Sequence, residues 1–224
     1  HFGDGSVPLV INGCCGNIHH ANHVDPAQSG DHEDMGRLLA QSTLRALEDA
    51  APVDPSSFRW SRRILPIPRR AIPAELLAEA EQMLRDYPNP LWKDAERIRV
   101  EWDWVYAVGI LDIADERATD PDYPYELQAL RIGDFALLGI MGEPFVEAQL
   151  RIKLESPFAF THVAHMCNGY VGYLPTQRAF SGGGYETRTG RGSRLVPEAL
   201  EMVETAAVGL LNGLHTSPGG KMQP

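Results

Sequence analysis

The fold of this chain is decided by residues 126–141, whose sequence is ELQALRIGDFALLGIM. Residues 126–132 alternate between polar and apolar side chains, which is typical of a strand with one buried face. Gly133-Asp134 indicates a tight two-residue turn. Residues 135–141 are almost wholly apolar, as in a fully buried strand. We therefore expect a hairpin in which one strand is buried.

Strands and helices flank this hairpin on both sides. Short apolar or alternating runs predict three further strands, at 7–11, 58–67 and 158–167. Apolar residues at helical spacing predict helices at 30–50, from 73 onward, and at 91–114, 144–154 and 196–214. Residues 115–125 are polar and contain proline, which predicts a loop. The expected class is therefore α/β, with helices packed on the faces of a mixed β-sheet.

The composition excludes several kinds of partner. The 224 residues carry a formal net charge of −10, whereas a protein that binds nucleic-acid phosphates needs a basic face. Cys14, Cys15 and Cys167 are too few for a disulfide scaffold. No run of about 18 apolar residues is present, so we expect no transmembrane segment. The chain begins at His1 without Met, and we expect it to be a piece of a longer protein.

Residues that can carry chemistry follow three of the predicted strands. They read GCCGNIHH at 13–20, MGEP at 141–144 and CNGYVGY at 167–173. In α/β sheets, ligands bind outside the carboxyl ends of the strands. If the three strands are neighbours, one sheet edge would carry His, Glu, Asn and Tyr side chains together. The tyrosines at this edge have two interpretations, since they could pack over the core or bind a metal or an oxyanion.

Glu143 also has two interpretations. It follows the buried strand and precedes Pro144, so its charge could stabilise the N-terminus of a helix by about 0.3–1 kcal/mol. Alternatively, it is a metal ligand or general base held on a rigid backbone. Gly142 would then allow a ligand to approach closely.

The histidines form a second candidate site. His19 and His23 are four residues apart, which is a zinc-binding spacing on a helix. The glycine and proline that flank them predict an exposed loop instead. Cys15 could be a nucleophile with His19 as its base, or a small buried hydrophobic residue. His162 and His165 are expected to be structural.

Four segments together resemble the neutral/alkaline, non-lysosomal ceramidase family, and most closely its shorter bacterial branch. They are LQALRIGD at 127–134, GEPF at 142–145, NGYVGY at 168–173 and GYET at 184–187. Their order and spacing are more specific than any one of them. The resemblance implies that residues 1–215 are the C-terminal part of one α/β catalytic domain. Residues 216–224 are expected to be a disordered tail.

The resemblance implies a zinc-dependent amide hydrolase that acts on N-acyl sphingosine or a related N-acyl lipid. Glu143 and Tyr173 would be two of four Zn²⁺ ligands, and Tyr185 would stabilise the oxyanion of the amide under attack. The other two ligands would be histidines in the missing N-terminal half of the domain. The resemblance also favours a secreted or periplasmic location.

One segment departs from the family pattern. The family has a Gly-Asp-Val-Ser-Pro-like segment whose serine belongs to the active site, and here His19 falls at the serine position. We expect His19 to orient the substrate or to shuttle a proton, and Gly16, Asn168 and Tyr170 to contact the substrate. The departure leaves open a second function, a non-catalytic binding module on the same scaffold. A hydrolase with a Cys15–His19 pair is a third.

Overall fold

The computed structural model describes residue 5 and residues 9–28, 30–52 and 57–216. Within these residues, the strands form one sheet of four strands and one of two. The strands are β1 (Phe58–Pro68), β2 (Asp122–Ile132), β3 (Phe135–Gly139), β4 (Glu143–Pro144), β5 (Phe160–Ala164) and β6 (Tyr173–Leu174). The helices are η1 (Pro26–Gln28, a 3-10 turn), α1 (His32–Glu48), α2 (Ala74–Asp86), α3 (Trp102–Thr119), α4 (Val146–Glu155), α5 (Gln177–Gly182) and α6 (Ala199–Thr216).

The larger sheet is mixed, as the sequence predicts. Its strand order is β1-β2-β3-β5, with antiparallel pairing from β1 to β3 and parallel pairing between β3 and β5. The predicted hairpin is confirmed, because Ile132 pairs with Phe135 across a turn in which Gly133 has a φ of 58°. In β3 only alternate side chains, those of Ala136 and Leu138, are fully buried.

β2 begins earlier than the sequence predicts. Residues 115–119 belong to α3 and residues 122–125 belong to β2, so the loop predicted at 115–125 is wrong except at residues 120 and 121. Tyr125 is fully buried, and its hydroxyl donates a hydrogen bond of 2.7 Å to the carbonyl oxygen of Met141. Pro124 lies opposite Pro66, on a part of β2 that pairs with β1 but extends beyond β3. Proline is tolerated there because β2 has a partner on one side only.

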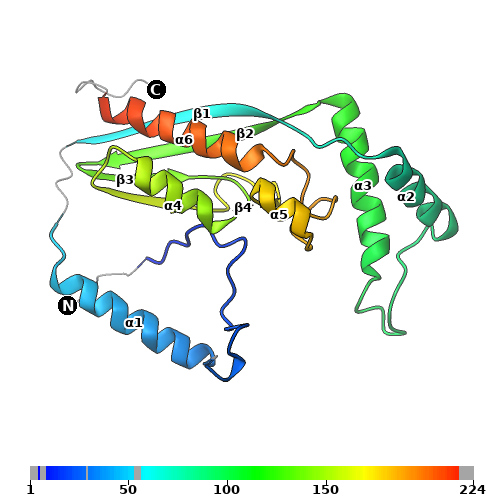
Figure 1. Cartoon of the computed structure of the whole chain (residues 1–224), viewed down its shortest axis with the longest axis horizontal. Helices are drawn as coiled ribbons and strands as arrows, with labels where there is room; N and C mark the ends of the chain where they lie inside the picture. The colour runs from blue at the N-terminus through cyan, green and yellow to red at the C-terminus, as the bar shows by residue number, and fades with distance from the viewer. Residues whose placement is uncertain (1–4, 6–8, 29, 53–56, 217–224) are drawn as a thin grey trace.

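Two helices cover one face of the sheet and enclose the core. α6 packs against β1 and β2, and α4 lies beside α6 and packs on β5 (Figure 1). The largest fully buried side chains are those of Tyr125, Ile67, Ile113, Leu127, Leu138, Ile140, Ile152, Leu174, Leu200, Leu211, Val163 and Val171. Each large apolar side chain buried in this way stabilises the fold by about 1.5–3 kcal/mol.

α2 and α3 form a separate helical pair to one side of the sheet (Figure 1). They share a small apolar cluster built around Ala80, Ala107 and Ile110. α3 begins at Trp102, eleven residues later than the sequence predicts. Residues 92–100 instead form a short loop, closed by a bridge between Trp92 and Val100.

α1 keeps its apolar side chains exposed. Asp31 caps it, as its carboxylate accepts hydrogen bonds of 2.9 Å from the amides of residues 33 and 34. The helix lies apart from the sheet (Figure 1), and Leu38 and Leu39 are 58% and 61% exposed.

Several predicted boundaries move. The strand predicted at 7–11 is wrong for residues 9–11, which are irregular and exposed, and residues 7 and 8 lie outside the described residues. Thr216, predicted to begin the tail, ends α6, and residues 217–224 are not among those described. No helix in the described ranges is long and apolar enough to cross a membrane.

Candidate active site

The candidate site is built on the two-stranded sheet. β4 and β6 pair in parallel, with Glu143 directly opposite Tyr173. The amide of Glu143 donates to the carbonyl oxygen of Gly172 at 2.9 Å, and the amide of Phe145 donates to that of Leu174 at 3.0 Å. Because residues paired in register project to the same face of a sheet, the Glu143 and Tyr173 side chains lie together.

Two glycines allow this pairing. Gly142 has a φ of +71°, and a Cβ there would lie 2.4 Å from the carbonyl oxygen of Gly172. Gly172 has a φ of +88°, and a Cβ there would lie 2.5 Å from the carbonyl oxygen of Gly192. That same oxygen accepts a hydrogen bond of 2.7 Å from the amide of Tyr173. The backbones on either side of β6 therefore approach too closely for any side chain at these positions.

Replacing Gly142 with Ala is expected to lower the free energy of unfolding by about 2–5 kcal/mol. The left-handed conformation costs a non-glycine residue about 1–2 kcal/mol, and the added methyl group overpacks the contact by about 1–3 kcal/mol. Urea denaturation would measure the change. Gly213→Ala is the matched control, since Gly213 is exposed in α6 and its Cβ would meet nothing within 4 Å. If Gly142→Ala were as stable as the unmodified protein, the close approach of the two backbones at Gly142 would be contradicted.

Three tyrosines surround Glu143. The Tyr170 hydroxyl donates a hydrogen bond of 2.7 Å to Oε1 of Glu143. The rings of Tyr173 and Tyr185 meet edge to face, with their centroids 5.5 Å apart. The structure thus brings together four residues that the sequence analysis singled out, from three separate motifs.

The surroundings keep two of these phenols protonated. Burial, and then the hydrogen bond to Glu143 and its charge, raise the pKa of Tyr170 to about 12. Burial also raises the pKa of Tyr173 well above its ordinary value, helped by its hydrogen bond to Tyr185 and the charge of Glu143. At neutral pH both hydroxyls are therefore hydrogen-bond donors.

Glu143 is not the N-cap of α4, so the interpretation of this residue as a capping charge is wrong. It lies in β4, and the N-cap is Phe145, which makes no side-chain cap. The first amide of α4, that of Val146, instead donates to Oδ1 of Asn17 at 2.8 Å. The sequence analysis missed this role of Asn17, although asparagine is a preferred capping residue.

The segment that contains Gly16 lies along β4. The Gly16 amide donates to the carbonyl oxygen of Pro144 at 3.0 Å, and a Cβ on Gly16 would lie 2.4 Å from the carbonyl oxygen of Glu143. Gly16 thus lets two backbones meet. Asn168, in a bend two residues ahead of Tyr170, has a φ of 61°. The bend precedes the tyrosine whose hydroxyl reaches Glu143.

The histidine segment is a loop, as its flanking residues predict. The His19 ring stacks on His20 with centroids 4.3 Å apart and lies 4.8 Å from the His23 ring. Its Nδ1 accepts a hydrogen bond of 3.0 Å from the amide of Ala21, so these contacts lie within its own loop. Across the described part of the chain, no group of three or more His, Cys, Asp or Glu side chains could hold a metal ion.

Cys15 lies against His165 rather than His19. Its Sγ is 3.8 Å from Nε2 of His165, just beyond the end of β5. Burial, and then the charge of Glu143, raise the pKa of the Cys15 thiol. Because the thiolate is the nucleophilic form, this arrangement argues against a Cys15–His19 hydrolase.

The sequence analysis missed one wall of the site. The three tyrosines line a pocket of about 470 Å³, whose opposite wall includes Trp102 and Tyr106 of α3. The family resemblance identifies no motif in residues 52–124. The aromatic run WDWVY at 102–106 was the available signal.

The fold is similar to that of the neutral ceramidase from Pseudomonas aeruginosa. The two share 16% sequence identity and a TM-score of 0.52, over 91% of this chain and 37% of that chain. A ceramidase solved in complex with C2 matches 44% of this chain and 16% of its own, at 20% identity and a TM-score of 0.37. No protein-family model matches the sequence, and no curated protein matches it. This chain therefore shares the arrangement of strands and helices of a neutral ceramidase and spans 37% of that enzyme's length.

Proposed function

We propose that this chain is part of a zinc-dependent amide hydrolase of the ceramidase type, which cleaves N-acyl sphingosine or a related N-acyl lipid. The observation that carries the proposal is the in-register pair of Glu143 and Tyr173, with Tyr170 and Tyr185 around it. The fold shared with a neutral ceramidase supports the choice of reaction.

The residues of this site fit part of a zinc shell. Zinc binds carboxylate oxygen and histidine nitrogen, and a catalytic zinc normally has three protein ligands and one open position. Glu143 and Tyr173 would supply two oxygen ligands. The hydrogen bond from Tyr170 would orient the Glu143 carboxylate, as partners behind metal ligands commonly do. The proposal therefore requires histidine ligands from outside these residues, as the family resemblance implies.

Each residue of the site would have a distinct task in hydrolysis. Zinc, when bound, supplies a water that ionises near neutral pH. The Tyr185 hydroxyl would donate to the amide oxygen as negative charge develops on it, an effect of about 3–4 kcal/mol for a well-placed donor. Trp102 and Tyr106, which line the same pocket, would contact the substrate. His19 would orient the substrate or move a proton.

The chain alone is expected to bind zinc with a dissociation constant above the micromolar range, because two protein ligands are too few for a catalytic zinc site. Equilibrium dialysis of the 224-residue chain would measure this affinity. The same measurement on a protein that also carries the upstream segment should give one tightly bound ion. Sub-micromolar, stoichiometric binding by the chain alone would contradict the division of ligands proposed here.

A non-catalytic binding module is the second candidate. It is favoured by His19, which occupies the family's serine position and makes its contacts within its own loop. Such a module would bind an N-acyl lipid without hydrolysing it. Release of fatty acid from N-acyl sphingosine by the zinc-loaded protein, abolished by a chelator, would exclude it.

A further inference from the structure

Three carboxylates on α3 meet three arginines of the loop that follows Tyr185. Nη2 of Arg188 lies 2.7 Å from Oδ1 of Asp103. Arg191 pairs with Asp112, and Nη1 of Arg194 lies 3.5 Å from Oε2 of Glu116. The arginines follow one another at intervals of three residues and meet the carboxylates in the same order. The loop therefore runs alongside α3.

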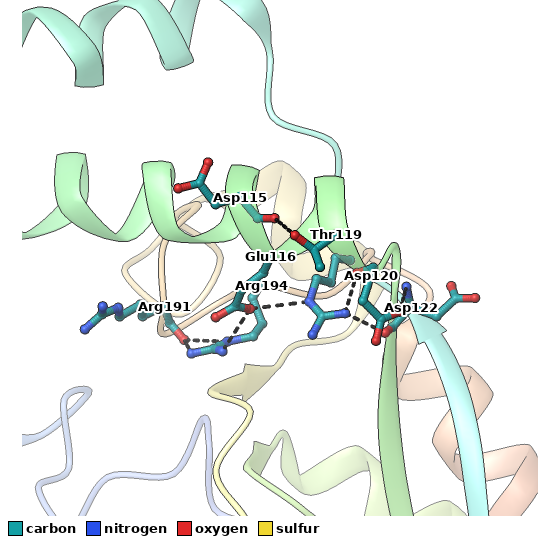
Figure 2. Close-up of polar contacts among 8 residues, drawn as sticks. Asp115, Glu116, Thr119, Asp120, Asp122, Arg191 and Arg194 are labelled. Carbon is teal, nitrogen blue, oxygen red and sulfur yellow. Dashed lines mark hydrogen bonds and ion pairs between the residues drawn. The ribbon is translucent and has the colours of Figure 1, made fainter.

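The C-terminal end of this contact is the most buried part. Figure 2 shows Glu116 on α3 reaching Arg194, whose guanidinium also donates to the carbonyl oxygen of Arg191 at 3.0 Å and 3.2 Å. The other partner of Glu116 is Arg69, only 9% exposed, which donates to the carbonyl oxygens of Asp120 and Asp122. This end joins α3, β2 and the loop.

The N-terminal end of the contact is held by Arg188. Its guanidinium carbon lies 3.7 Å from the centroid of the Tyr106 ring, in addition to the ion pair with Asp103. Gly190 follows, and a Cβ there would lie 2.9 Å from Cδ1 of the same ring. Tyr106 is thus covered by the loop, and Arg188 is the nearest of the three arginines to Tyr185 in sequence.

A short turn connects Tyr185 to Arg188, so a shift of Arg188 would also shift Tyr185. The hydroxyl and amide of Thr187 donate to the carbonyl oxygen of Gly184, which closes the turn from 184 to 187. At the start of the turn, Gly183 and Gly184 have φ angles of +75° and +105°, and neither has a side chain that could anchor this side of the turn. Tyr185 is 62% exposed, so contacts with neighbouring residues fix its ring only in part.

We propose that Arg188, held between Asp103 and the Tyr106 ring, is a positioning residue that keeps the Tyr185 hydroxyl beside Tyr173. This positioning role rests on the proposed function only for the catalytic task of Tyr185. The turn stays attached to the segment that follows β1 without Arg188, because Arg70 donates to the carbonyl oxygen of Thr187 at 2.9 Å. Loss of Arg188 should therefore move Tyr185 without unfolding the protein.

The test measures how close Tyr173 and Tyr185 lie. Brief photo-oxidation would couple neighbouring phenols into dityrosine, and peptide mapping would quantify the 173–185 product, with Tyr185→Phe as the blank. Arg188→Ala is expected to lower this yield by about fivefold, as an exposed ion pair and a cation–π contact are lost together. Arg188→Lys should give an intermediate yield, because the charge remains and the planar stacking is lost. Gly190→Ala should also lower the yield, by pushing the loop from Tyr106.

Arg178→Ala is the matched control, since Arg178 is an exposed arginine of α5. The dityrosine yield and the melting temperature of Arg178→Ala should equal those of the unmodified protein. An unchanged yield in Arg188→Ala would overturn the proposal. So would a lower yield accompanied by a large loss of melting temperature, because Arg188 would then stabilise the fold as a whole.

Cross-linking needs neither zinc nor substrate, so its outcome stands even if the proposed hydrolysis fails. If hydrolysis is observed, Arg188→Ala should lower kcat by about fivefold with little change in KM, since only the donor to the developing oxyanion has moved.

Discussion

Replacing Glu143 with Gln is expected to remove both the bound zinc and the turnover. The amide keeps the size of the side chain and can still accept a hydrogen bond from Tyr170, so the fold should not change. It lacks the negative charge that a zinc ligand supplies. Even residues behind the ligands change metal affinity by about 10–100-fold, so loss of a direct ligand should exceed that range.

The measurement is zinc content by atomic emission, beside fatty-acid release, in a protein that carries the whole zinc site. Glu147→Gln is the control, since Glu147 lies in the first turn of α4, where Asn17 donates to its carboxylate at 2.9 Å. That variant should keep its zinc and its activity. Zinc retained at full occupancy in Glu143→Gln would remove Glu143 from the ligand set.

Replacing Tyr185 with Phe is expected to lower kcat by about 10²–10³ with little change in KM, while zinc and fold are kept. The ring still packs edge to face on Tyr173, and only the hydroxyl is lost. That hydroxyl is the donor proposed for the developing oxyanion, so its loss raises the barrier and leaves substrate binding intact.

Steady-state kinetics on an N-acyl sphingosine would measure this effect. Tyr87→Phe is the control, because Tyr87 is the exposed C-cap residue of α2, and its backbone, which the substitution keeps, donates to the carbonyl oxygen of Met83 and accepts from the indole of Trp104. Full turnover in Tyr185→Phe, together with retained zinc in Glu143→Gln, would remove both residues from the proposed mechanism.

The sequence predicted the elements whose signals are local. The hairpin was predicted correctly because its alternation, its turn and its apolar run all lie within residues 126–141. The start of β2 was missed because Pro124 and its polar neighbours are typical of a loop. They are tolerated in a strand only because Pro66 lies opposite and β3 ends short of them, which is a property of the assembled sheet.

In the candidate site, too, the sequence predicted the features with a local signal and missed those that depend on the assembled fold. Glu143 and Tyr173 were singled out by motif, but their pairing depends on a register between strands 30 residues apart in sequence. The contribution of α3 was not predicted, since the ion pairs of Arg188, Arg191 and Arg194 join segments that no local pattern connects.

The brevity of β4 and β6 has a consequence for the order in which the molecule folds and opens. Each strand has two residues, and their alignment requires the backbone at Gly172 to meet Gly192. The hairpin closes a turn of two residues, whereas the site must close loops of about 20–30 residues, which costs more chain entropy. The few backbone hydrogen bonds between β4 and β6 offset only a small part of that entropy cost. The tyrosine site should therefore form after the sheet, and thermal fluctuations should open it while the core beneath α6 stays closed.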